Sequence, residues 1–129
     1  MQPTPLTISV LPGTLSVCRL PAHSPLPAWA TQGAFFSVTR TADELSIMCD
    51  DHVVPPHVQC ERPWRAFKIE GPLPFELTGI LLSVAAPLAD AGIGIFALAT
   101  YDTDYVLVRE AQWEQAKAAL TAYGHHVLP

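Results

Sequence analysis

The chain has 129 residues, of which 50% are hydrophobic and 15% charged, and its formal net charge at pH 7 is −5. A chain of this length forms about one compact domain and buries roughly 65–70% of its unfolded surface. The seven lysines and arginines are scattered rather than gathered in a basic stripe, which argues against nucleic acid as a partner. The sequence shows neither the charged start of a signal peptide nor an apolar run of the roughly 20 residues that span a membrane. We expect a cytoplasmic protein with no membrane partner.

The cysteines also indicate the cytoplasm. The three cysteines, Cys18, Cys49 and Cys60, are an odd number, so they cannot form a complete set of intrachain disulfides. Reduced thiols in a reducing compartment are the simpler interpretation.

The first half of the chain is predicted to form strands. Prolines are frequent there, with Pro21, Pro25 and Pro27 close together and Pro55 and Pro56 adjacent, so little helix is expected. Short apolar runs bounded by proline, glycine and acidic residues predict strands. These runs cover residues 15–20, 35–39 and 45–49.

The second half alternates strands and helices. Phe67 and Ile69 alternate with polar neighbours, as in a strand with one covered face. Apolar residues from Leu77 to Ala91 then follow the helical spacing i, i+3, i+4, i+7, and Gly92 provides the stop. Further elements are a hairpin with strands over 95–100 and 105–108, a helix over 110–123 and a short strand over 125–128. The order β-α-β-β-α-β is the ferredoxin-like plan, in the α+β class.

An internal repeat is suggested when residues 34–51 are aligned without a gap on residues 94–111, at an offset of 60. Phe36 then meets Phe96, and apolar strand positions meet apolar strand positions. We interpret residues 1–62 as a degenerate first unit with shortened helices and residues 63–129 as a complete second unit. Two unrelated hairpins of similar length would align about as well, so this alternative stays open.

Three motifs carry a resemblance to a known family: Thr78-Gly79-Ile80, PLADAGI over 87–93 and TYDTDYVLV over 100–108. The segment around them resembles the ACT-domain superfamily, and in particular small proteins of two tandem ACT-like units, similar to one half of the CASTOR arginine sensors. The resemblance implies ferredoxin-like βαββαβ ACT units in tandem, with an antiparallel sheet and helices on one face. It also implies a homodimer that binds a free amino acid or similar metabolite and regulates another protein in trans, without catalysis of its own.

The resemblance also implies a set of ligand-binding residues. They are Thr78, Gly79, Ile80, Asp90, Gly92, Ile93 and Asp104. Unpaired N–H groups in the first turn of a helix suit a ligand carboxylate, and an acidic side chain such as Asp104 can accept an amino or guanidinium group. The alternatives are a plain helix stop at Gly92, a solvated turn residue at Asp104 and a surface position at Thr78.

A rival constellation lies in the segment CDDHVVPPHVQC. It spaces Cys49, His52, His57 and Cys60 as C-x2-H-x4-H-x2-C, and four nitrogen and sulfur ligands are what structural zinc needs. The Pro-Pro pair would have to fold this loop back tightly, so we expect no metal here, and zinc binding stays open as the alternative. We expect no cofactor.

Catalytic motifs are absent from the sequence: there is no G-x-S-x-G and no phosphate-binding G-x-x-x-x-G-K-[ST]. We therefore expect that the chain is not an enzyme. The alternative to ligand-dependent regulation is a protein–protein interaction or structural module whose ligand site is vestigial.

Overall fold

The computed structural model describes residues 5–71 and 78–129, and the chain divides into two compact units. The N-terminal unit is Gly13–Trp64, and the C-terminal unit combines Met1–Pro12 with Arg65–Pro129. The division expected from the sequence, at residues 62 and 63, differs from this one because the first strand of the chain lies with the C-terminal unit.

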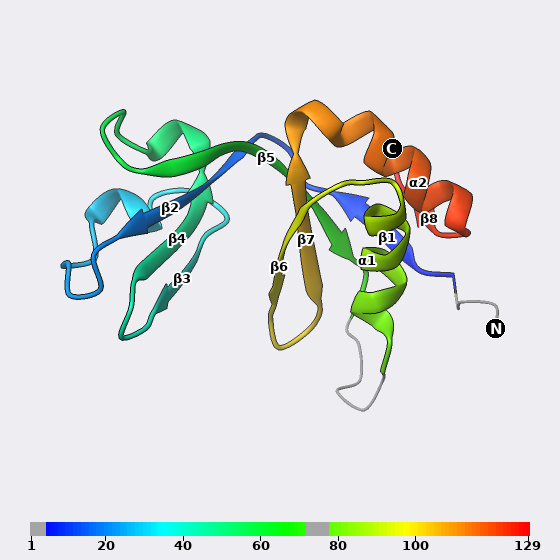
Figure 1. The fold of residues 1–129 in the computed structure, drawn as a ribbon, viewed down its shortest axis with the longest axis horizontal. Coiled ribbons are helices and arrows are strands. Elements are labelled where there is room, and N and C mark those ends of the chain that lie inside the picture. The colour runs from blue at the N-terminus through cyan, green and yellow to red at the C-terminus, as the bar shows by residue number, and fades with distance from the viewer. Residues whose placement is uncertain (1–4, 72–77) are drawn as a thin grey trace. The chain divides into compact units, whose positions relative to one another are not determined.

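The N-terminal unit is a small antiparallel sheet with two single-turn 3-10 helices (Figure 1). Its strands are β2 (Leu15–Leu20), β3 (Ser37–Arg40), β4 (Leu45–Asp50) and the first part of β5 (Cys60–Ile69), and its 3-10 helices are η1 (Ala28–Thr31) and η2 (Asp51–Val53). The strands pair in the order β3-β4-β2-β5, and each neighbouring pair is antiparallel. This is the ferredoxin-like order with 3-10 turns in place of helices, which confirms the shortened unit expected from the sequence.

Proline explains why the helices of this unit are so short. Pro21, Pro25 and Pro27 occupy the connection that leads into η1, and Pro55 and Pro56 follow η2 closely. Proline within a helix removes a backbone hydrogen bond and clashes with the preceding turn. The core is correspondingly small and consists of six buried residues: Cys18, Ala30, Leu45, Ile47, Cys49 and Val54.

The C-terminal unit contains the α-helices. Its elements are β1 (Thr7–Val10), the second part of β5, α1 (Ile80–Asp90), β6 (Ile95–Ala99), β7 (Asp104–Arg109), η3 (Glu110–Gln112), α2 (Trp113–Tyr123) and β8 (His126–Val127). The strands pair in the order β6-β7-β5-β1-β8. The predicted β-α-β-β-α-β order of β5 through β8 is thus confirmed, although Leu77, where the helical pattern begins, lies outside the described residues.

Strand β1 is an addition to the ferredoxin-like plan that the sequence analysis missed. It lies between β5 and β8, antiparallel to β5 through the pair Ile8 and Ile69, and parallel to β8 through the pair Ile8 and Val127. The sheet, expected to be antiparallel, therefore contains the parallel pair of β1 and β8. A four-residue strand gives too little alternation to stand out in a sequence.

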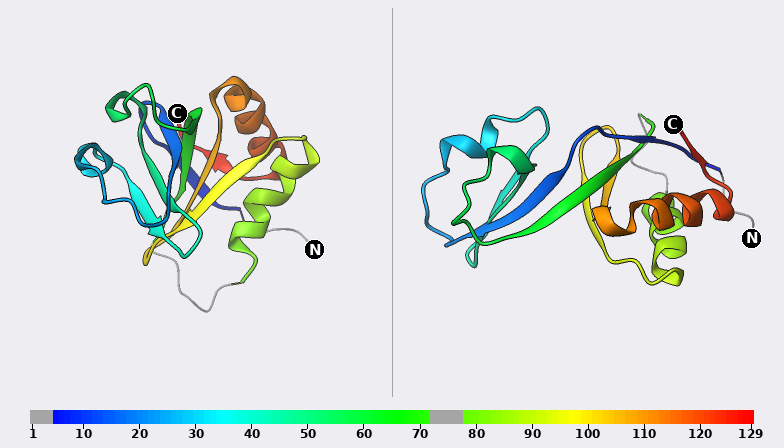
Figure 2. Two further views of the ribbon diagram at one scale, coloured as in Figure 1. Left: turned by 60° about the vertical axis from the view of Figure 1, so that its left-hand side comes forward. Right: turned by 90° about the horizontal axis from the view of Figure 1, so that it is seen from above.

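Both α-helices cover the same face of the C-terminal sheet (Figure 2). Val84 and Leu88 of α1 share one buried core with Trp113, Ala116 and Leu120 of α2. The strands contribute Ile8, Phe67, Ile69, Val106 and Val108 to the same core. The Trp113 indole stacks on Phe67 with ring centroids 4.2 Å apart, and the Arg65 guanidinium lies over the indole at 4.4 Å. Within residues 5–71 and 78–129, no helix is long and apolar enough to cross a membrane.

The two hairpins of the predicted repeat correspond in the structure at an offset of 59, not at the predicted 60. In both hairpin turns a threonine N–H donates to the carbonyl three residues later, from Thr41 to Glu44 at 2.9 Å and from Thr100 to Thr103 at 2.8 Å. Strands β4 and β7 follow directly, with six residues each, and η2 and η3 follow those. The gapless alignment was misled by the Phe36–Phe96 identity. Because side chains alternate along a strand, this slip of one residue exchanged the two faces of the sheet.

A buried histidine joins three segments of the C-terminal unit. His125 is 4% exposed, and its Nδ1 accepts a hydrogen bond from the Leu6 N–H at 3.1 Å. Its Nε2 lies 2.7 Å from the Ser83 carbonyl oxygen and donates to it in the neutral tautomer that leaves Nδ1 free to accept. The ring thus links the chain before β1, the helix α1 and the chain before β8.

We predict that His125→Ala lowers the free energy of unfolding by about 2–4 kcal/mol, because it leaves the Leu6 N–H and the Ser83 carbonyl unpaired. The matched control is His126→Ala, since His126 is exposed and should contribute within about 0.5 kcal/mol. Urea unfolding of both variants is the measurement. Equal losses in the two variants would contradict the role of His125.

Candidate functional site

The seven predicted site residues fall into two groups at opposite ends of α1. Thr78, Gly79 and Ile80 mark its start, whereas Asp90, Gly92 and Ile93 mark its end. Helix α1 has eleven residues and is therefore about 16 Å long. Within one chain the two groups cannot contact the same small ligand.

Asp104 belongs with the first group. It is the first residue of β7, directly after the turn between β6 and β7, and Figure 1 shows this turn at the same end of the unit as the start of α1. The hydroxyl of Thr103 donates to the carbonyl of Ile69, which ties the turn to the end of β5. The start of α1 and Asp104 therefore form the candidate site.

The start of α1 presents uncapped N–H donors. Gly79 is the N-cap residue, with a left-handed φ of 78°, and no side chain in residues 5–71 and 78–129 makes a capping hydrogen bond there. The first turn contains no acidic side chain, and both Thr78 and Gly79 are exposed. The first-turn N–H groups can donate hydrogen bonds to an anion from solvent, and the positive end of the helix dipole attracts it.

Asp104 lies on the helix-covered face of the sheet. Val106 and Val108 belong to the core beneath the helices, and alternation along β7 places Asp104 on their side. At the offset of 59, Asp104 occupies the position that Leu45, 1% exposed, holds in the N-terminal unit. Asp104 itself is half-buried, and its carboxylate has no hydrogen-bond or ion-pair partner among residues 5–71 and 78–129. A carboxylate thus stands where the equivalent strand carries a core leucine.

The second group is explained by the end of the helix. Gly92 has a φ of 76°, and its N–H donates to the Ala89 carbonyl at 2.9 Å, as in a left-handed helix stop. Ile93 is 4% exposed and belongs to the core, and its N–H donates to the Leu88 carbonyl. Asp90 is exposed at the last helical position. These contacts account for Gly92 and Ile93 without a ligand.

The rival zinc hypothesis requires Cys49, His52, His57 and Cys60 to converge on one point, and the described residues do not arrange them so. Cys49 lies in the core of the N-terminal unit, whereas His52 and His57 are exposed. In the part of the chain that the structure describes, no group of three or more histidine, cysteine, aspartate or glutamate side chains is arranged to hold a metal ion.

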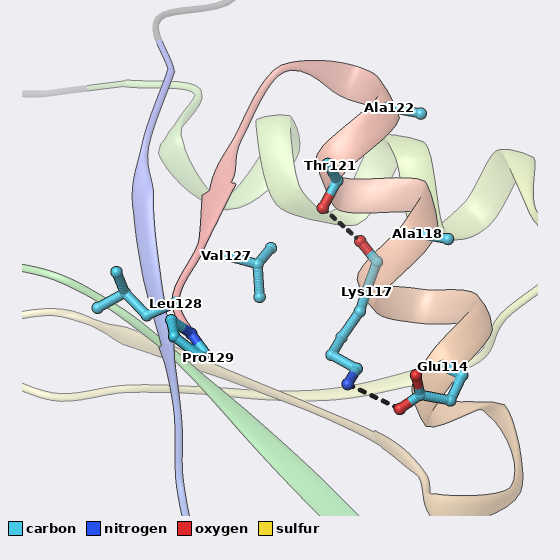
Figure 3. A pocket seen from close by; sticks show the side chains of 8 residues that line it. All are labelled: Glu114, Lys117, Ala118, Thr121, Ala122, Val127, Leu128 and Pro129. Carbon is cyan, nitrogen blue, oxygen red and sulfur yellow. Dashed lines mark hydrogen bonds and ion pairs between the residues drawn. The ribbon is translucent and has the colours of Figure 1, made fainter.

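A shallow groove of about 590 Å³ lies elsewhere on the C-terminal unit, between α2 and the end of the chain (Figure 3). It is lined by Glu114, Lys117, Ala118, Thr121, Ala122, Val127, Leu128 and Pro129. The Lys117 ammonium pairs with the Glu114 carboxylate at 2.7 Å, and the Thr121 hydroxyl donates to the Lys117 carbonyl at 2.8 Å. None of the seven predicted residues lines this groove. Its sequence signal is the small and polar stripe of α2 opposite the core stripe, which resembles any solvated helix face.

Comparisons with known proteins identify the class of the fold. A model of the ACT domain matches residues 59–122, which include all seven predicted site residues, and a separate model of an N-terminal domain matches residues 13–57. The chain belongs to the ACT-domain superfamily. It is similar over nearly its whole length to protein Atu0741 from Agobacterium tumefaciens, whose crystal structure is 42% identical, with a TM-score of 0.92 over 98% of this chain and 94% of that chain.

Two further relatives share part of the sequence. Putative protein CASTOR3P from Homo sapiens is 34% identical over 91 residues, which are 60% of this chain and 56% of that protein. Cytosolic arginine sensor for mTORC1 subunit 1 from Bos taurus is 33% identical over 87 residues, 59% of this chain and 26% of that protein. In each case the shared segment is about half or less of the relative's own length.

We predict that Asp104→Leu raises the free energy of unfolding by about 0.5–1.5 kcal/mol, since it restores the core residue of the equivalent strand and removes a half-buried carboxylate. Asp102→Leu is the control, because Asp102 is exposed in the adjacent turn and should change stability by less than about 0.5 kcal/mol. Chemical unfolding of both variants tests this. A clear loss of stability in Asp104→Leu would show that the carboxylate supports the fold instead.

Proposed function

We propose that this chain is a non-catalytic regulatory protein that binds a free amino acid between the start of α1 and Asp104. The single observation that carries the proposal is the half-buried carboxylate of Asp104, which has no partner among the described residues and stands where the equivalent strand has a buried leucine. A polar residue kept at a core position weakens packing, and such exceptions to local sequence rules are typical of functional sites.

The chemistry of the two groups matches the two charges of an amino acid. The uncapped N–H donors at Ile80 and the positions after it suit the α-carboxylate, and Asp104 suits the α-amino group or a cationic side chain. Ile80 is half-buried against the core and offers apolar contact beside these polar groups. A site with one anion-binding and one cation-binding group selects zwitterions over simple carboxylic acids.

The relatives support this choice of ligand class. One of them is named a cytosolic arginine sensor, so arginine is the first amino acid to test. Its guanidinium group fits a planar, charge-assisted interaction with a carboxylate. Since this chain covers about a quarter of that relative, the ligand, the regulated target and action in trans are parts of the proposal.

We also propose that two copies of the chain form a cytoplasmic homodimer through their C-terminal units. In such a dimer the second group of predicted residues, Asp90, Gly92 and Ile93, would complete the site from the other subunit. Asp90 is exposed at the end of α1 and is available for that role.

One observation favours the alternative, an interaction module with a vestigial ligand site. The outward surface of α1 is apolar: Leu82 is 68% exposed and Leu81 is 40% exposed. A helix whose solvent side carries leucines is suited to contact with a protein.

We predict that one or a few amino acids, tested as a panel that includes arginine, raise the melting temperature of the purified chain. A ligand at a hundred times its Kd adds about 2.7 kcal/mol to the stability. Asp104→Asn should then weaken binding about ten- to a hundredfold in calorimetry, since it removes a charge-assisted interaction worth about 1.5–3 kcal/mol. Asp43→Asn is the matched control, because Asp43 is exposed in the equivalent turn of the N-terminal unit.

Gly79→Ala tests the helix start, and Gly13→Ala controls for backbone strain. Both glycines have a φ of 78°, and an added Cβ at either position would meet no atom of the described residues within 4 Å. The two variants should therefore lose similar stability, about 1–2 kcal/mol, while only Gly79→Ala weakens binding. Binding that survives both Asp104→Asn and Gly79→Ala would move the site elsewhere. No binding to any amino acid would favour the interaction module.

A further inference from the structure

The three cysteines of the N-terminal unit form one cluster on the core face of its sheet. Cys18 on β2 and Cys49 on β4 belong to the buried core, and Cys60 at the start of β5 packs against it. The Cys18 thiol interacts with both other sulfurs. At the offset of 59, Cys49 corresponds to Val108 of the C-terminal unit, so packing at this position does not require sulfur.

The strand register places two of the thiols directly opposite each other. Cys18 and Cys60 are register partners in the antiparallel pair of β2 and β5. The Arg19 N–H donates to the Gln59 carbonyl at 3.0 Å, so the adjacent Cys18–Cys60 pair is not hydrogen-bonded. In such pairs the Cα atoms are about 4.5 Å apart, and disulfides need about 4.4–6.8 Å. This spacing allows a cross-strand disulfide.

Cys49 is less well placed for the same bond. Cys18 pairs with Ile47 in the register of β2 and β4, so Cys49 lies two residues further along, on the diagonal. Diagonal neighbours are typically about 7–8 Å apart, beyond the usual disulfide range. The strand register therefore favours Cys60 rather than Cys49 as the covalent partner of Cys18.

Access from solvent also distinguishes the thiols. Cys18 is 2% exposed and Cys49 is fully buried, whereas Cys60 is half-buried. A small oxidant can reach Cys60 first, and Cys18 lies opposite Cys60 on the neighbouring strand. An accessible thiol beside a second thiol that can resolve its sulfenic acid is one feature of reversible oxidation sites.

We propose that Cys60 and Cys18 are a reversible oxidation site at which a hydroperoxide converts two thiols into an intrachain disulfide. The Cys60 thiolate attacks one peroxide oxygen, the O–O bond breaks, and the other oxygen leaves as water or an alcohol after it takes up a proton. Cys60 is then a sulfenic acid. The Cys18 sulfur attacks the Cys60 sulfur, the S–O bond breaks, and the hydroxyl leaves with the Cys18 proton as water. The two thiols lose two electrons, which reduce the peroxide.

The experiment treats the full chain with hydrogen peroxide and follows it by intact mass and by peptide mapping without reductant. The expected product is a monomer that is lighter by two hydrogens, with residues 18 and 60 linked, and dithiothreitol should restore the original mass. Cys49→Val, which places the valine of the equivalent strand, should still form the link. Cys60→Ser should form none.

Several results would overturn the proposal. They are an unchanged mass, a sulfinic acid at Cys60, a disulfide between two chains, a link that uses Cys49, or loss of the link in Cys49→Val. The wild-type peptide map gives the answer even if a variant fails to fold.

The pH dependence of the reaction is a second prediction. Burial raises the pKa of the Cys60 thiol above its ordinary value. Only the thiolate attacks peroxide, so the oxidation rate should rise about tenfold per pH unit across the neutral range and level off only above the ordinary pKa of a cysteine. Rates measured from pH 6 to 10 by thiol alkylation test this. A rate that is already constant from pH 7 upward would contradict entry through Cys60.

Discussion

The backbone pairing of strand β5 constrains both units of this protein. Its first part pairs with β2 and completes the four-stranded sheet of the N-terminal unit, and its second part pairs with β1 and β7 in the C-terminal unit. A ten-residue strand is long enough to serve as the last strand of one ferredoxin-like unit and the first strand of the next. Phe67 and Ile69 in the second part of β5 are both buried, and they join the larger core that the two helices cover. The smaller unit has only 3-10 turns to cover its sheet, so its core stays small.

The difference between the units shows how sequence determines the size of a core. Both have the same strand order through the repeated hairpin, with threonine-started turns at Thr41 and Thr100. Proline-rich connections limit the first unit to single turns, whereas the second has two helices of eleven residues. The three thiols of the first unit lie on the core face of its sheet, where the strand register places them.

Much of the fold could be predicted from the sequence because its long elements have strong periodicity. The strand 15–20, the helix ending before Gly92 and the helix ending at Tyr123 were correct within a few residues. Strand β1 was missed because its four residues carry too little pattern, and its pairing with β8 depends on residues over a hundred positions apart. The repeat was recognised, but an accidental Phe36–Phe96 match shifted it by one residue.

The candidate site was predictable only in part. Helix ends can be recognised in a sequence, so the predicted site residues included both ends of α1. Only the structure shows that about 16 Å of helix separates the two ends. The core position of Asp104 could be predicted only with the correct repeat offset. An offset of 60 aligns Asp104 with Glu44, a turn residue, whereas an offset of 59 aligns it with the buried Leu45. The thiol pair depended on strand register, which no spacing along the chain reveals.

The most direct test of the proposed site is an amide NMR titration of the isotope-labelled chain with the panel of free amino acids, arginine first. The account predicts that a binding amino acid shifts the amide signals of Gly79, Ile80 and Asp104, while those of the groove residues Lys117 and Thr121 stay unchanged. Shifts confined to the groove, or spread over the outward face of α1 without the helix start, would contradict it.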